Sequence, residues 1–164
     1  MNILTGCQSN CDQPGSGASG GDVQSRIIGY YEGWNQNEKC IGMGLQDIPI
    51  NGITHLHLAF ASLTADFDVI PMDGLSTQLF VDITALKSQN AGLKVIASIG
   101  GWTFSDNGTS TQPIFPDMVS SANKRSTAIT KVLSFLRQYA FDGVDYDWEY
   151  PFVGLILFQF TSFS

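Results

Sequence analysis

The sequence has little positive charge. It contains 8 Lys and Arg residues against 15 Asp and Glu residues, which gives a net charge of −7 over 164 residues. Binding to a nucleic-acid backbone depends on cationic side chains that neutralise phosphates. The charge balance therefore predicts no nucleic-acid partner, and it suits an uncharged ligand.

Long apolar runs are also missing. No stretch reaches the roughly 20 apolar residues that a membrane helix needs, so the sequence predicts no membrane span. The first residues, MNILTGCQSNCD, lack the basic start and the continuous apolar segment of a secretory signal. We expect no signal peptide in this chain.

Cysteine is scarce. Cys7, Cys11 and Cys40 form an odd set, so at least one thiol is free or has its partner outside this sequence. Asn107 begins the tripeptide Asn-Gly-Thr, an N-glycosylation sequon. The sequon predicts glycosylation of Asn107, a modification typical of secreted proteins.

Two kinds of segment alternate after residues 14–25, a Gly- and Ser-rich stretch with the composition of a linker. Four short segments rich in β-branched and aromatic residues predict strands at 26–31, 53–60, 94–100 and 143–148. Two segments have apolar residues at helical spacing. They are 78–89, with Leu79, Ile83 and Leu86, and 121–140, with Ile129, Val132, Leu133, Leu136 and Tyr139.

Strands separated by helices predict an α/β protein with a parallel sheet, because a parallel pair needs a crossover connection. Four such units are half of a (β/α)8, or TIM, barrel, and we expect that fold for residues 26–151. An open doubly wound sheet is the alternative that periodicity leaves open.

The last predicted strand carries a regular row of acids, DGVDYDWE, at residues 142–149. Because side chains alternate between the two faces of a strand, Asp145, Asp147 and Glu149 share one face, about 6.6 Å apart. We therefore expect their titrations to be coupled. A solvated face of an antiparallel sheet or a Ca²⁺ or Mg²⁺ site would explain such acids too. The apolar opposite face, with Val144 and Trp148, favours a polar cleft.

Four segments resemble glycoside hydrolase family 18. DGVDYDWE fits the DxxDxDxE signature of that family and SIGG, residues 98–101, fits its SxGG motif. GYYEGWN, residues 29–35, and THLHLAFA, residues 54–61, are similar to its first two barrel strands. The segments look most like fungal chitinases related to the killer toxin α-subunit.

The N-terminal stretch GCQSNCDQP, residues 6–14, resembles the end of a hevein-type chitin-binding module. The resemblance implies a remnant of that module over residues 1–13. It also implies a disulfide between Cys7 and Cys11, because the final two cysteines of such a module pair with each other.

The family resemblance implies a role for each acid of the row. Glu149 would be the general acid and base, and Asp147 would orient the N-acetyl group of the substrate, which itself attacks the anomeric carbon. Asp145 would share a proton or a hydrogen bond with Asp147, and strand parity would place Tyr30 and Ser98 beside Asp145.

The resemblance also implies the ligand. Tyr30, Phe60, Ser98, Gly101 and Trp102 would contact the sugar, with no metal and no cofactor. The substrate would be chitin or a chitooligosaccharide, and the location would be extracellular.

Some residues have simpler interpretations. His55 and His57 alternate on a strand and could bind metal, yet isolated histidines more often pack or form hydrogen bonds. Gly100 and Gly101 could hold phosphate, although no P-loop pattern follows them.

Two other activities share the signature. An endo-N-acetylglucosaminidase acting on glycans would carry the same acids, and a chitin lectin would commonly lack the last acid, which is present here as Glu149.

The segment 152–164, FVGLILFQFTSFS, is apolar and does not resemble the family. Only half of a barrel precedes it. We expect the 164-residue chain to show no chitinase activity on its own and no cooperative thermal unfolding.

Overall fold

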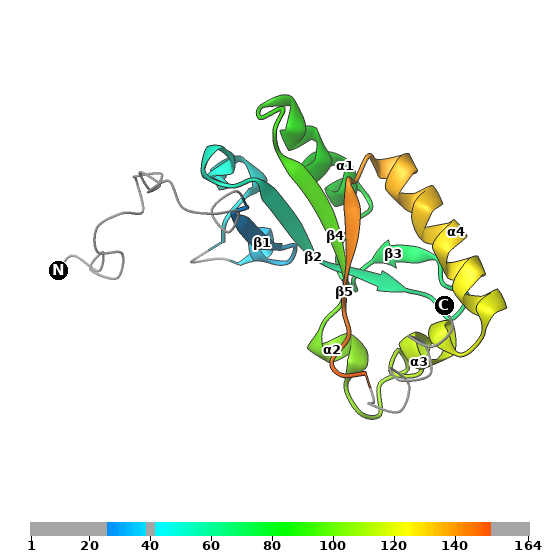
Figure 1. The fold of residues 1–164 in the computed structure, drawn as a ribbon. Coiled ribbons are helices and arrows are strands. Elements are labelled where there is room, and N and C mark those ends of the chain that lie inside the picture. Colours follow the sequence, from blue (N-terminus) through cyan, green and yellow to red (C-terminus); the bar gives the residue numbers. More distant parts are fainter. Residues whose placement is uncertain (1–25, 39–41, 152–164) are drawn as a thin grey trace.

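The computed structural model describes residues 26–38 and 42–151 (Figure 1). The predicted module remnant, the linker, the apolar segment 152–164 and the three cysteines Cys7, Cys11 and Cys40 lie outside these residues. Within the described ranges, no helix has both the length and the apolar character needed to cross a membrane.

Four parallel strands form the sheet, in the order β1-β2-β4-β5. They are β1 (Ile28–Glu32), β2 (His55–Leu63), β4 (Lys94–Gly100) and β5 (Gly143–Asp147). A short strand, β3 (Val69–Pro71), pairs antiparallel with the end of β2. The parallel strands follow one another without the reversal of order that defines a doubly wound sheet. The predicted partial barrel is therefore the correct alternative.

The helices connect β2 to β4 and β4 to β5, and the two longest of them cover one side of the sheet (Figure 1). They are α1 (Gln78–Ala85), α2 (Trp102–Ser105), α3 (Ile114–Val119) and α4 (Ala122–Tyr139), with short 3₁₀ turns between other elements. All four predicted strands and both predicted long helices are present. The sequence did not predict β3, α2 or α3, because elements of three to six residues give too few positions for a periodic signal.

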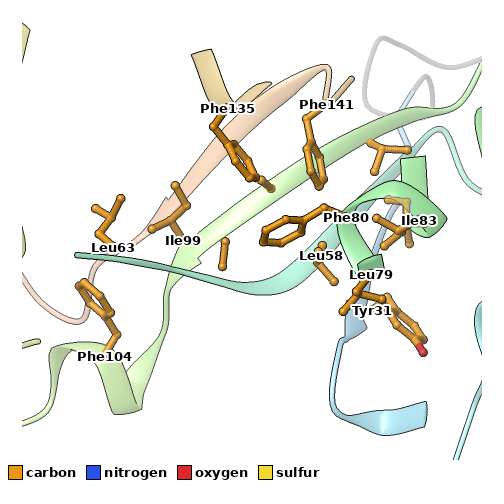
Figure 2. Close-up of a cluster of buried hydrophobic side chains, with 14 of the residues drawn as sticks. Tyr31, Leu58, Leu63, Leu79, Phe80, Ile83, Ile99, Phe104, Phe135 and Phe141 are labelled. Atoms are coloured by element: carbon orange, nitrogen blue, oxygen red, sulfur yellow. The ribbon is translucent and has the colours of Figure 1, made fainter. Parts of the chain in front are cut away.

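The core lies between the sheet and helices α1 and α4 (Figure 2). The ring of Phe80 on α1 is in edge contact with Phe135 on α4 and with Phe141, at centroid distances of 5.1 and 5.9 Å. Leu58 and Ile99, from β2 and β4, are fully buried in the same cluster. Removal of a ring from such a core costs roughly 3–5 kcal/mol of stability.

Helix α4 is rotated from the orientation that the sequence predicts. The predicted stripe was wrong for Ile129 and Leu133, which are 56% and 43% exposed, whereas Ala128, Val132 and Phe135 are buried. The physical reason is the aromatic cluster: packing of the Phe135 ring onto Phe80 turns the helix so that Ile129 and Leu133 face outward. On α1 and the turn after it, the predicted Leu79, Ile83 and Leu86 are all buried.

The residue before β5, Asp142, fastens the start of this strand to its neighbours. Its carboxylate accepts hydrogen bonds from the backbone N–H of Val95 at 2.9 Å and from Lys87 Nζ at 3.1 Å. Partial burial opposes ionisation, but these donors outweigh it and lower the pKa of Asp142. The carboxylate thus has a structural role at the turn before β5.

Candidate active site at the carboxyl end of β5

The pairing of β4 with β5 places the two sequence motifs side by side. Ser98 lies opposite Asp145, and Gly100 lies opposite Asp147. On the other face of β5, the rings of Tyr146 and Trp148 contact Phe115 of α3. The predicted alternation is confirmed within β5, where the Asp145 side chain lies on the face opposite to the Tyr146 ring. The strand ends at Asp147, so Glu149 lies beyond it.

Asp145 lies in a network with three polar side chains. Its Oδ2 accepts hydrogen bonds from the Tyr30 hydroxyl and the Ser98 hydroxyl, both at 2.9 Å. His57 Nδ1 lies 3.4 Å from the same oxygen. Desolvation of the hydroxyl, followed by the hydrogen bond to Asp145, raises the pKa of Tyr30 to about 12. The predicted proximity of Tyr30 and Ser98 to Asp145 is confirmed as geometry.

His57 is the member of this network that the sequence did not indicate as a site residue. It lies directly beside Tyr30 in the register of β1 and β2, and the two rings are 4.6 Å apart. Its place in the site follows from the strand register that the structure gives, because Tyr30 was already a candidate and its lateral neighbour on β2 shares its face.

Asp147 is the central acid of the row. Partial burial, the charge of Glu149 and the charge of Asp145, in that order, raise its pKa. The proton or hydrogen bond shared with Asp145 that the resemblance implies stays a prediction.

The two glycines of the SIGG motif shape the backbone beside these acids. Gly100 and Gly101 have φ angles of +116° and +84°, a region that favours glycine. The backbone N–H of Gly101 donates to the carbonyl oxygen of Asp147 at 2.8 Å. A Cβ on Gly101 would lie 2.8 Å from Cε2 of Phe60. The glycines thus let β5 and the Phe60 ring approach β4.

A pocket of about 580 Å³ opens beyond the carboxyl ends of β4 and β5. Two of the predicted site residues, Trp102 and Glu149, line it. Trp102 is 59% exposed, and its ring lies 6.5 Å from the ring of Tyr150 in an edge orientation. The backbone N–H of Glu149 donates to Ser105 Oγ at 3.3 Å, which ties the acid to α2. The pocket therefore combines an exposed aromatic surface with a carboxyl group.

Other predicted residues lie outside the lining of this pocket. Four of them lie within the strands of the sheet: Tyr30, Ser98, Asp145 and Asp147. The ring of Phe60 packs against Gly101 and stacks on the ring of Trp34 at a centroid distance of 6.2 Å. The structure adds residues to the wall that the sequence did not single out: Ser105, Asp106, Gln112 and Tyr150. They lie in short segments without a periodic pattern, which gave no signal for them.

Asn107, the residue of the sequon, lies on the pocket wall and is exposed. Its Oδ1 accepts a hydrogen bond from Gln112 Nε2 at 2.8 Å. Glycosylation of Asn107 stays a prediction.

Within residues 26–38 and 42–151, no three His, Cys, Asp or Glu side chains are grouped in a way that could hold a metal ion.

Comparison with known families gives a match over the whole described sheet. The family model described as glycosyl hydrolases family 18 matches residues 26–154. The chain is 37% identical over 152 residues to the probable chitinase LysM18 of Penicillium expansum, covering 92% of this chain and 10% of that protein. It is 32% identical to the secreted chitinase LysM12 of the same organism, with 89% and 9% covered. The killer toxin subunits alpha/beta of Kluyveromyces lactis are 33% identical, with 89% and 12% covered.

Solved structures agree with these matches. The Group IV chitinase of Ostrinia furnacalis superposes with a TM-score of 0.65 at 28% identity, covering 77% of this chain and 33% of that one. Human YKL-39, described as a pseudo-chitinase with retained chitooligosaccharide binding, superposes with a TM-score of 0.65 at 31% identity, covering 84% and 38%. The chain thus spans about a tenth of the fungal relatives named above and about a third of these solved chains.

Proposed function

Since the chain belongs to family 18 of the glycosyl hydrolases, we propose that it carries the catalytic strand of a chitinase-type hydrolase. The substrate is a β-1,4-linked N-acetylglucosamine polymer, cleaved with retention of configuration. One observation carries the proposal: Glu149 lies on the pocket beside the exposed Trp102, two residues after Asp147 and four after Asp145, which are both partly buried. Barrel enzymes place their chemistry at this end of the strands.

In the proposed reaction, Glu149 gives its proton to the glycosidic oxygen, and the bond between that oxygen and the anomeric carbon breaks. The carbonyl oxygen of the substrate's own N-acetyl group attacks this carbon and forms an oxazolinium ion. Asp147 accepts the acetamido N–H, and its negative charge stabilises the cation. Glu149 then removes a proton from water as the water attacks, which regenerates both the acetamido group and the carboxylic acid.

The neighbouring groups support this division of roles. The raised pKa of Asp147 reflects partial burial beside Glu149 and Asp145, since crowded carboxylates resist simultaneous ionisation. The hydrogen bonds from Tyr30 and Ser98 hold the side chain of Asp145 in place. Trp102 offers a ring face on which a sugar can stack.

The likeness to YKL-39 favours a second candidate, a non-catalytic chitooligosaccharide binder. The retained carboxyl group of Glu149 on the pocket supports hydrolysis instead. We place the protein outside the cell, because the similar LysM12 is named a secreted chitinase.

We further propose that the 164-residue chain does not hydrolyse chitin alone. It spans 33% of the solved Group IV chitinase. Apolar side chains on the two outer parallel strands are exposed, among them Ile28 and Tyr30 on β1 and Tyr146 on β5. Release of a chromophore from a chitobioside by the purified monomeric chain would contradict this.

A chimera tests the proposed activity. Residues 26–151 replace the equivalent segment of the Ostrinia furnacalis Group IV chitinase, which restores a whole barrel; we refer to this protein as the barrel chimera. We expect it to hydrolyse acetylated chitooligosaccharides and to leave their fully deacetylated counterparts intact, because the acetamido group takes part in the reaction. Equal rates on both substrates would reject substrate assistance, and a folded but inert chimera would reject the enzyme assignment.

A further inference from the structure

His57 lies at the centre of the polar face of the sheet, although the proposed reaction does not use it. It is flanked by Tyr30 on β1 and Ile96 on β4 in the strand register, and its side chain is only 12% exposed. Its ring packs against the Tyr30 ring at a tilt of 54°. Its Nδ1 lies 3.4 Å from both Asp145 Oδ2 and Ser98 Oγ. One nitrogen of a largely buried imidazole thus faces both a carboxylate oxygen and a hydroxyl oxygen.

The hydrogen bonds around Asp145 determine which atom carries the proton. A serine or tyrosine hydroxyl has one proton to donate. The hydroxyls of Tyr30 and Ser98 both give theirs to Asp145 Oδ2. Ser98 Oγ and Asp145 Oδ2 therefore offer only lone pairs to His57. An unprotonated Nδ1 between two lone-pair donors would be repelled, so Nδ1 must carry a hydrogen.

We infer that His57 is a positioning residue, held with its proton on Nδ1 and donating a shared hydrogen bond to Ser98 Oγ and Asp145 Oδ2. Together with Tyr30 and Ser98 it places three donors on one carboxylate oxygen. This arrangement fixes the rotamer of Asp145, whose negative charge acts on Asp147 two residues further along β5. The tautomer is a property of the folded network, whereas its effect on turnover rests on the proposed function.

The tautomer can be measured directly. The sequence has two histidines, so His55→Gln leaves one imidazole in the segment 26–151, and the spectrum of His57→Leu assigns its signal in the chimera. Its ¹⁵N shifts, followed from about pH 5 to about pH 9 across the range in which imidazoles usually titrate, distinguish Nδ1–H from Nε2–H in the neutral ring. We expect Nδ1–H in the barrel chimera and in every folded preparation of the 164-residue chain. We expect a shift towards Nε2–H when Asp145→Leu removes the acceptor. Predominant Nε2–H with Asp145 intact would overturn the inference.

Kinetics separate positioning from packing. Asparagine carries an N–H donor close to the place of Nδ1, and leucine fills the space without a donor. In the barrel chimera, His57→Leu should lower kcat about tenfold with little change in KM, as expected for loss of a hydrogen bond to a charged group. His57→Asn should retain kcat within about threefold. Equal losses in both variants would show that His57 only fills space, and would overturn the inference.

The matched control is His55→Leu, on the same face of β2, whose ring contacts Thr54 and not Asp145. It should leave kcat unchanged. A chimera that folds but is inert with His57 in place would contradict the proposed function only. The ¹⁵N spectra would still decide the tautomer of His57.

Discussion

Gly100 and the backbone of Asp147 lie in direct contact across β4 and β5: a Cβ on Gly100 would lie 2.3 Å from the Asp147 carbonyl oxygen. No real Cβ tolerates that approach, so any side chain at residue 100 must push the end of β5 away. Gly100 of the SIGG motif therefore allows the acid row to lie this close to β4. Its positive φ angle is a second reason for a glycine at this position.

Gly100→Ala should destabilise the barrel chimera by more than about 2 kcal/mol, since it combines a strained φ with a backbone clash. The control is Gly74→Ala, which has a φ of +81° but open space around its Cβ position, and which should cost about 1 kcal/mol. Urea unfolding measures both. Equal costs would show that the close approach to Asp147 has no energetic weight.

Asp147→Asn should raise stability while it removes activity. The folded-state pKa of Asp147 is raised, so the ionised side chain costs stability at pH values above its unfolded value, and this cost grows as pH rises. The amide removes the charge. Tm should be higher than that of the unchanged chimera near neutral pH, and the difference should shrink as pH falls to about 3. A lower Tm at neutral pH would contradict the assigned shift.

Asp142→Asn should have the opposite effect and lower the stability of the chimera. The folded-state pKa of Asp142 is lowered, so its stabilisation is present above the unfolded pKa and is lost as pH falls through the folded value. Near neutral pH we expect a loss of about 1 kcal/mol, after screening by solvent, and almost none near pH 2. Asp66→Asn, an exposed acid, serves as the control. A loss that does not depend on pH would reject the ionic role.

Much of this site could be predicted because strand parity is local. The alternation of Asp145 and Asp147 with Tyr146 and Trp148 needs only the two-residue period of a strand, and the motifs predicted the family correctly. His57 could not be placed, because its neighbours depend on the register between β1, β2 and β4, which tertiary packing sets.

The sequence pattern also could not predict which face of α4 is buried. Ile129 and Phe135 are both apolar, and only the presence of Phe80 and Phe141 decides which of them is buried. The pocket wall at Ser105 and Gln112 comes from the short helix α2 and the turn after it, whose shape depends on individual hydrogen bonds.

The most direct test of the proposed function is Glu149→Gln in the barrel chimera, because it removes the proton donor at nearly constant shape. Chromophore release from a chitobioside gives hydrolysis, and calorimetric titration with a chitooligosaccharide gives binding. We predict loss of hydrolysis by a factor of at least about 100 with binding retained within about threefold. Turnover equal to that of the unchanged chimera would contradict the assignment of Glu149 as the catalytic acid.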